Sequence, residues 1–169
     1  MNDTGGNERY RALRKLALVL VAAPVVVGVV LYLLLGTADG GMDGPPAWLL
    51  LGQVVFAVAI LALVEAVGYR AKPAEIGESD VVGNASVLAF QSAMLLRFAL
   101  CETLMIVSVA LSFVATPHTF LNYPLGGLLS LALMVFEVLP NRRSVARTQA
   151  ALESRGRPSY LHEALGLGG

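Results

Sequence analysis

Cysteine and histidine are scarce in this chain, and each scarcity excludes a class of site. The 169 residues include one cysteine, Cys101, so the chain cannot form an intrachain disulfide or a cysteine-based zinc or iron–sulfur site. The two histidines, His118 and His162, lie outside the apolar runs, which excludes a haem held by two histidines inside a bilayer. We therefore predict no metal and no cofactor.

Charge is also scarce. Charged residues make up 14% of the chain, whereas a soluble domain carries about 25%. Twelve basic and twelve acidic residues give a net charge of zero, so bulk charge offers no argument for binding nucleic acid. Ten of the basic residues are arginine, a bias typical of GC-rich bacterial genomes.

Four long apolar runs account for the missing charge. They lie at residues 16–36, 47–69, 89–115 and 120–140. Each reaches the roughly 20 residues that a helix needs to cross about 30 Å of hydrocarbon. A plausible helix start at 83–86 extends the third predicted helix to 86–115. The sequence predicts an all-α integral membrane protein, a single domain built as an up-down bundle of four transmembrane helices, with a tail at 141–169.

The distribution of basic residues predicts the orientation. Every lysine and arginine except Arg97 lies before the first run, between the second and third, or after the fourth. Cytoplasmic loops carry the excess of Lys and Arg, so both termini are predicted to be cytoplasmic. The expected location is the plasma membrane of a bacterium, with multiple passes.

Three glutamates lie inside the apolar runs, and each is five residues from an arginine. The pairs are Glu65 with Arg70, Glu137 with Arg142, and Glu102 with Arg97. A carboxylate at bilayer depth costs about 2.5–3.5 kcal/mol on insertion scales, so it usually faces a protein interior or a cavity. We expect a glutamate layer near one face of the membrane, with Arg97 as counter-charge, that can share a proton or hold a cation.

Plainer interpretations of these polar residues stay open. Glu65 and Glu137 are near predicted helix ends and could extend to the headgroups or pair with a nearby arginine. Gln91 precedes Glu102 by eleven residues, about three helical turns, so the two share a face. That face is either a polar track from the cytoplasm to Glu102 or a contact with another helix.

Small residues at helical spacing predict packing faces, because they let helix backbones approach closely in lipid. They are Ala59, Ala62 and Ala66 on the second helix, and Gly126 and Ser130 on the fourth. Pro24 predicts a bend in the first helix, because proline removes a backbone donor and crowds the preceding turn.

The tail and the hydroxyl groups of the third helix carry weaker signals. Val145, Thr148 and Leu152 form a short, weakly amphipathic stripe in the tail. Ser108, Ser112 and Cys101 are possible nucleophiles, but no histidine or lysine accompanies them within the membrane as a base. The sequence therefore predicts no catalytic residues.

Two phrases resemble known proteins. Gly52-Gln53-Val54-Val55-Phe56 and Arg97-Phe98-Ala99-Leu100-Cys101-Glu102 resemble the G-Q-x-x-F and R-x-A-L-x-E phrases of uncharacterised small four-helix bacterial membrane proteins. The second phrase is also similar to the proton-carrying helix of rotary ATPase proteolipids, and that resemblance implies a proton-binding role for Glu102. The glycine-rich inner helix of those proteolipids has no counterpart here.

These observations predict a non-enzymatic membrane subunit or accessory protein that packs within a larger membrane complex or a homo-oligomer. The expected partners are the lipid bilayer and other membrane subunits, or further copies of the chain. The alternative is proton or cation translocation or sensing through the glutamate layer. A lipid-active enzyme is a third possibility.

Overall fold

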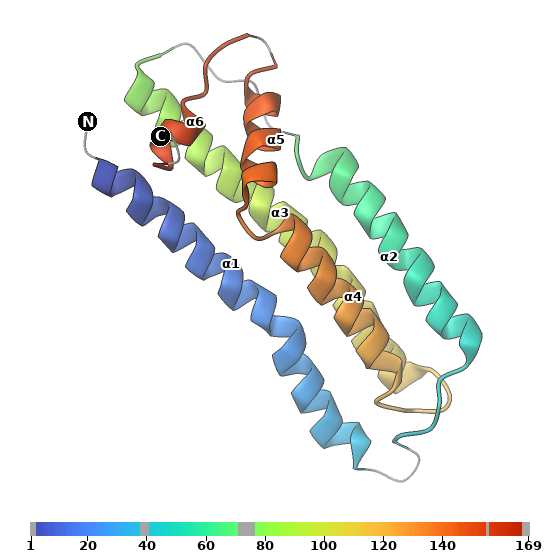
Figure 1. Cartoon of the computed structure of the whole chain (residues 1–169). Helices are drawn as coiled ribbons and strands as arrows, with labels where there is room; N and C mark the ends of the chain where they lie inside the picture. The colour runs from blue at the N-terminus through green and yellow to red at the C-terminus, as the bar shows by residue number, and fades with distance from the viewer. Residues whose placement is uncertain (1–2, 38–40, 71–76, 155, 167–169) are drawn as a thin grey trace.

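The computed structural model describes residues 3–37, 41–70, 77–154 and 156–166, and it describes side chains from residue 8 onward. All regular structure in this part of the chain is helical (Figure 1). The elements are α1 (Asp3–Leu31), a π-helical turn η1 (Tyr32–Gly36), α2 (Ala47–Val67), α3 (Ser79–Val114), α4 (Asn122–Glu137), α5 (Arg142–Leu152) and α6 (Leu161–Ala164).

The four long helices α1 to α4 lie side by side, and successive helices run in opposite directions (Figure 1). Helix α4 packs against α1, α2 and α3. The start of α1 lies at the same end of the molecule as α5 and α6, which we call the tail end. At the opposite end, which we call the loop end, the Thr119 side chain and the Phe120 amide both donate hydrogen bonds to the Gly41 carbonyl.

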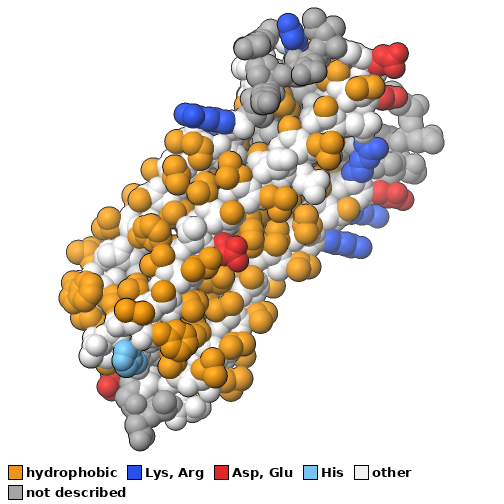
Figure 2. Space-filling view, turned by 180° about the vertical axis from the view of Figure 1, so that it is seen from behind, with side chains coloured by type: hydrophobic (Ala, Val, Ile, Leu, Met, Phe, Trp, Pro, Cys, Tyr) orange, Lys and Arg blue, Asp and Glu red, His pale blue; other side chains and the backbone are white. Residues whose placement is uncertain are grey.

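Three helical segments are long and apolar enough to cross a membrane: Glu8–Gly36, Ala47–Val67 and Ser79–Val114. A fourth is possible if α4 and α5, which meet at a bend of 62°, form one broken span. Many large apolar side chains of these helices point outward, and they cover the middle of the face shown in Figure 2, while the basic side chains on that face lie toward one end. Such a surface fits a multi-pass membrane protein, because lipid tails cover it without a hydration cost.

Helix α1 is longer than its apolar run. It begins at Asp3, not near residue 16, and continues through Pro24. The ribbon of α1 changes direction along its length (Figure 1), as expected for a helix that contains an interior proline. The hydroxyl of Tyr123 on α4 donates a hydrogen bond to the Pro24 carbonyl, so α4 is joined to α1 at this residue.

Helix α3 also extends beyond its apolar run, because the tail covers its first turns. It begins at Ser79, and Val82, Gly83 and Ser86 are buried there. A Cβ atom placed on Gly83 would lie 3.3 Å from the Cβ of Ala164 on α6, so the helices touch at this glycine. The expected start near residue 86 falls inside the helix.

The tail folds back against α3 and contributes to the main core. Val145, Leu152, Leu161 and Leu165 are buried with Phe90 and other side chains of the helices. The expected stripe of the tail is thus its buried face. Asn141 begins α5 as a capping residue, because its side chain accepts from the Ser144 amide while Ser144 accepts from the Asn141 amide. This cap fixes the bend after α4, which ends at Glu137.

Candidate functional site

Two of the three predicted glutamates lie in one group of polar side chains, where α2 and α4 end at the tail end of the molecule. We call this group the charged cluster, and its members are Glu65, Tyr69, Arg97, Glu137, Arg143 and Arg147. It joins α2, α3, α4 and α5. Arg97 and Glu137 form its interior, and Glu65, Arg143 and Arg147 form its rim.

At the rim, Glu65 binds the tail. Its Oε1 atom is 3.0 Å from Arg143 Nη2, and its Oε2 atom accepts a hydrogen bond from Arg147. This hydrogen bond raises the pKa of the Arg147 guanidinium above its ordinary value. These side chains are partly exposed, so each ion pair contributes at most about 1 kcal/mol in water. Their geometric effect is larger, because they fasten the end of α2 to α5.

In the interior, the Arg97 side chain is 0% exposed. Its Cζ atom lies 4.4 Å from the centre of the Tyr69 ring and 5.8 Å from the centre of the Phe90 ring. None of its three guanidinium nitrogens has a hydrogen-bond acceptor among the described residues. A buried cation stacked on aromatic faces gains cation–π attraction but still carries a large desolvation cost. Arg97 therefore depends on the charges around it.

Glu137 supplies the nearest buried negative charge. It is 2% exposed, and its Oε2 atom accepts a hydrogen bond of 2.5 Å from the Tyr69 hydroxyl. Its Oε1 atom lies 4.0 Å from Arg143 Nη2. Tyr69 thus presents its ring to Arg97 and its hydroxyl to Glu137, so one side chain links the buried cation to the buried carboxylate.

Gly68 makes room for this arrangement. A Cβ atom at Gly68 would lie 2.6 Å from Arg97 Cγ, which is closer than any ordinary contact. The apolar stem of Arg97 passes over the Gly68 backbone to reach Tyr69. A larger residue at this position would displace the Arg97 side chain.

Glu102 lies outside the charged cluster. It is half-buried on α3, and no hydrogen bond or ion pair joins it to any described residue. It does not pair with Arg97 of the same chain, because five residues correspond to about 140° around a helix. Gln91 is half-buried and lines a groove between α1 and α3.

A second set of polar side chains is buried nearer the loop end. Gln53 Nε2 donates to the Asn122 carbonyl at 2.7 Å, and Asn122 Nδ2 donates to the Leu111 carbonyl at 3.2 Å. These bonds join α2, α3 and α4 at one place. The side-chain oxygens of Gln53 and Asn122 accept no hydrogen bond from the described residues. The sequence feature that could have indicated this contact is one amide side chain inside each of two apolar runs, Gln53 in 47–69 and Asn122 in 120–140.

The predicted small residues fall into two groups. Gly126 and Ser130 lie at the contact between α3 and α4, where Ser130 donates to the Cys101 carbonyl at 2.8 Å. Ala59, Ala62 and Ala66 are exposed, because α2 packs against the other helices of the chain through a different face. That buried face consists of Leu49, Gln53, Ala57, Ile60 and Val64.

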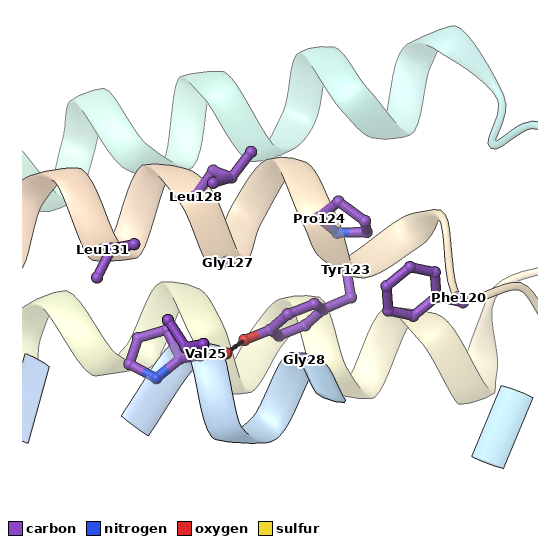
Figure 3. A pocket seen from close by; sticks show the side chains of 9 residues that line it. Val25, Gly28, Phe120, Tyr123, Pro124, Gly127, Leu128 and Leu131 are labelled. Carbon is purple, nitrogen blue, oxygen red and sulfur yellow. Dashed lines mark hydrogen bonds between the residues drawn. The ribbon is translucent and has the colours of Figure 1, made fainter. Parts of the chain in front are cut away.

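An apolar groove of about 280 Å³ is lined by residues of α1 and α4 toward the loop end (Figure 3). Gly28 and Gly127 border it, and the Tyr123 ring lies between them. The dashed line in Figure 3 marks the hydrogen bond that the Tyr123 hydroxyl donates, and its acceptor is the Pro24 carbonyl, so this donor is already used. Apart from Tyr123, the residues that line the groove are apolar or glycine.

The described residues contain no group of three or more side chains able to hold a metal ion. Three members of the charged cluster were not expected there: Tyr69, Arg143 and Arg147. Tyr69 is the last residue of the second apolar run. The two arginines reach the cluster because α5 turns back at Asn141, and the expected partners Arg70 and Arg142 make no ion pair with a described acidic residue.

No protein-family model matches the chain, and comparison with curated proteins and with solved structures finds no match.

Proposed function

We propose that the chain is a non-enzymatic membrane subunit that assembles through α2, with a second copy of itself or with another subunit of a larger complex. In this proposal α1 to α4 form a four-span bundle in the plasma membrane of a bacterium, with both termini in the cytoplasm. The concentration of basic residues outside the apolar runs supports this orientation.

The observation that carries the proposal is an exposed row of residues on α2. Gly52, Val55, Ala59, Ala62 and Ala66 are all exposed, and they alternate at spacings of three and four. This spacing places them on one stripe of a helix, as at the contact positions of a coiled coil. Small residues on such a stripe let two helices approach closely in lipid, where close packing drives association. We call this row the α2 seam.

The charged cluster supports the α2 seam mechanically. Glu65 and Tyr69 lie near the end of α2, and they bind Arg143, Arg147 and Glu137 of the helices behind it. Gln53 fastens the other half of α2 to α4. Helix α2 is therefore held at two levels on its inner face, and its outer face is presented as a fixed surface.

Cysteine cross-linking in native membranes tests this proposal. In a Cys101→Ala background, Ala62→Cys is expected to give an oxidation-dependent cross-linked product. The matched control is Leu61→Cys, because Leu61 is the adjacent exposed residue and points about 100° away around the helix. A dimer-sized product indicates a second copy, and a product of another size indicates a different subunit. Equal or absent cross-linking at both positions would contradict assembly through the α2 seam.

A second function is favoured by Glu102 alone. Glu102 is a half-buried carboxylate without a described partner on a helix able to cross a membrane, and an ionisable side chain in such a helix is usually functional. This supports proton or cation binding, in line with the resemblance of its phrase to proteolipid helices. Dicyclohexylcarbodiimide, which modifies protonated carboxyl groups within membranes, is expected to label the native chain and not Glu102→Gln. Absence of labelling at neutral pH would remove this candidate.

A further inference from the structure

A groove of about 240 Å³ lies between the first turns of α1 and α3, apart from the charged cluster and the α2 seam. Its lining consists of Arg9, Ala12, Leu13, Leu16, Val87 and Gln91. Arg9 and Gln91 are polar, and the other four residues are apolar. The groove therefore combines one cation and one amide with a hydrocarbon wall.

Arg9 is held at this groove by α3. Its Nη1 atom donates a hydrogen bond to Asn84 Oδ1, one turn before Val87 on the same helix. Its Nη2 and Nε atoms have no hydrogen bond to a described side chain. A guanidinium presents its donors in a planar fork that matches the oxygens of a phosphate.

The groove lies at the level where the apolar helices end. The Tyr10 hydroxyl donates to the Pro140 carbonyl at 3.0 Å, which places the first turns of α1 beside the end of α4. The apolar run of α1 begins at Leu16, and the same helix exposes Arg11, Arg14 and Lys15 beside Arg9. Glu8 is the described acidic residue next to them on α1, and Asp80 lies one turn before Asn84 on α3, so the basic residues outnumber the described acidic ones here. Basic residues next to a membrane span attract anionic lipids.

We propose that this groove binds an anionic phospholipid of the adjacent leaflet. The Arg9 guanidinium and the Gln91 amide donate to its phosphate, and an acyl chain lies against Leu13, Leu16 and Val87. The positive surface of α1 selects a headgroup with net negative charge over a zwitterionic one. The proposal does not depend on the α2 seam, because every lining residue belongs to α1 or α3 of one chain.

Native mass spectrometry of the full chain in mild detergent tests the site. The probes are dioleoyl phosphatidylglycerol and dioleoyl phosphatidylcholine, titrated separately, with bound lipid counted per chain. The native chain is expected to bind the anionic lipid more tightly, and Arg9→Gln is expected to weaken that binding about tenfold or more, because it removes charge-assisted hydrogen bonds to the phosphate. Gln91→Leu is expected to weaken it by a smaller factor.

The matched control is Arg11→Gln, which removes the same charge from the same helix at a residue that does not line the groove. It is expected to retain most of the affinity. Equal losses of lipid affinity in Arg9→Gln and Arg11→Gln would show that diffuse electrostatic attraction, and not binding in this groove, holds the lipid. Equal affinity of the native chain for the two lipids, or displacement of the anionic lipid by millimolar inorganic phosphate, would also overturn the proposal.

Discussion

Among single residues, Gly126 shows most directly how close α4 lies to α3. A Cβ atom at this position would lie 1.7 Å from Ser108 Oγ and 2.8 Å from Ser108 Cβ. Ser108 cannot move away easily, since it is fully buried and its hydroxyl donates to the Leu104 carbonyl at 2.8 Å. The glycine is therefore required by the distance between the two backbones.

Gly126→Ala is expected to lower the free energy of unfolding by about 1–3 kcal/mol, the usual cost of overfilling a packed interior. Gly44→Ala is the control, because nothing lies within 4 Å of a Cβ atom there and Gly44 is outside the α2 seam. Thermal unfolding in detergent, followed by circular dichroism, measures both. Equal melting temperatures for the two variants would show that the contact at Ser108 relaxes without cost.

Arg97 and Glu137 are expected to depend on each other, because each is a buried charge. Arg97→Met leaves the Glu137 carboxylate with Arg143 as its nearest cation, at 4.0 Å, and is expected to cost about 3–5 kcal/mol. The double variant Arg97→Met with Glu137→Gln removes both charges and is expected to recover most of that loss. Chemical unfolding of the two single variants and the double variant measures the coupling. Additive losses would show that the two side chains act independently.

The sequence singled out three charges that the structure places in the charged cluster, but not their partners. Glu65, Arg97 and Glu137 were identified because a charge within an apolar run is costly and demands an explanation. The pairing with Tyr69, Arg143 and Arg147 depends on how each helix is rotated about its axis and on where α5 turns. Membrane helices are apolar on nearly every side, so hydrophobic periodicity does not reveal that rotation.

Among the elements, the tail is held by Glu153. Its Oε1 atom accepts hydrogen bonds from the Ser159 amide at 3.1 Å, the Ser159 hydroxyl at 2.9 Å and Gln149 Nε2 at 2.9 Å. Partial burial alone would raise the pKa of Glu153, but these hydrogen bonds outweigh it and the pKa is lowered. The carboxylate form thus fastens the chain between α5 and α6.

This direction of shift predicts how the tail responds to acid. A carboxyl group with a lowered pKa stabilises the folded state at neutral pH, and the contribution is lost as the pH falls below about 4. Amide hydrogen exchange in residues 156–166 is expected to accelerate there relative to Glu153→Gln at the same pH. Parallel exchange curves for the native chain and the variant from pH 7 to pH 3 would contradict this role.

Helix boundaries were predicted less well than the apolar segments themselves. Run length identified the apolar core of each long helix, because about 20 apolar residues match the thickness of the hydrocarbon. The polar extensions of α1 and α3 were not visible, since those turns are stabilised by contacts with distant parts of the chain. Leu161 and Leu165 are fully buried against such turns, although they come from a short segment without a clear helical pattern.

For the whole molecule, the orientation in the membrane is the first property to measure. Eleven of the twelve basic residues lie outside the apolar runs on the side predicted to be cytoplasmic. In a Cys101→Ala background, Asp43→Cys is expected to react with an impermeant maleimide added to intact cells. Arg157→Cys is expected to react only after the cells are opened. The opposite labelling pattern would contradict the predicted orientation and place the tail outside the cytoplasm.

Three hydrogen-bonded contacts between the two halves of the chain, which we call joints, also bear on how many polypeptides the fold requires. The half that contains α1 and α2 contacts the half that contains α3 and α4 through the Gly41 carbonyl at one end, the Gln53 amide between, and the Glu65 carboxylate at the other. A break in the main chain between Gly77 and Glu78 leaves all three joints intact. The same architecture can therefore be built from two polypeptides, one with α1 and α2 and the other with α3 to α6, that recognise each other after each has entered the membrane.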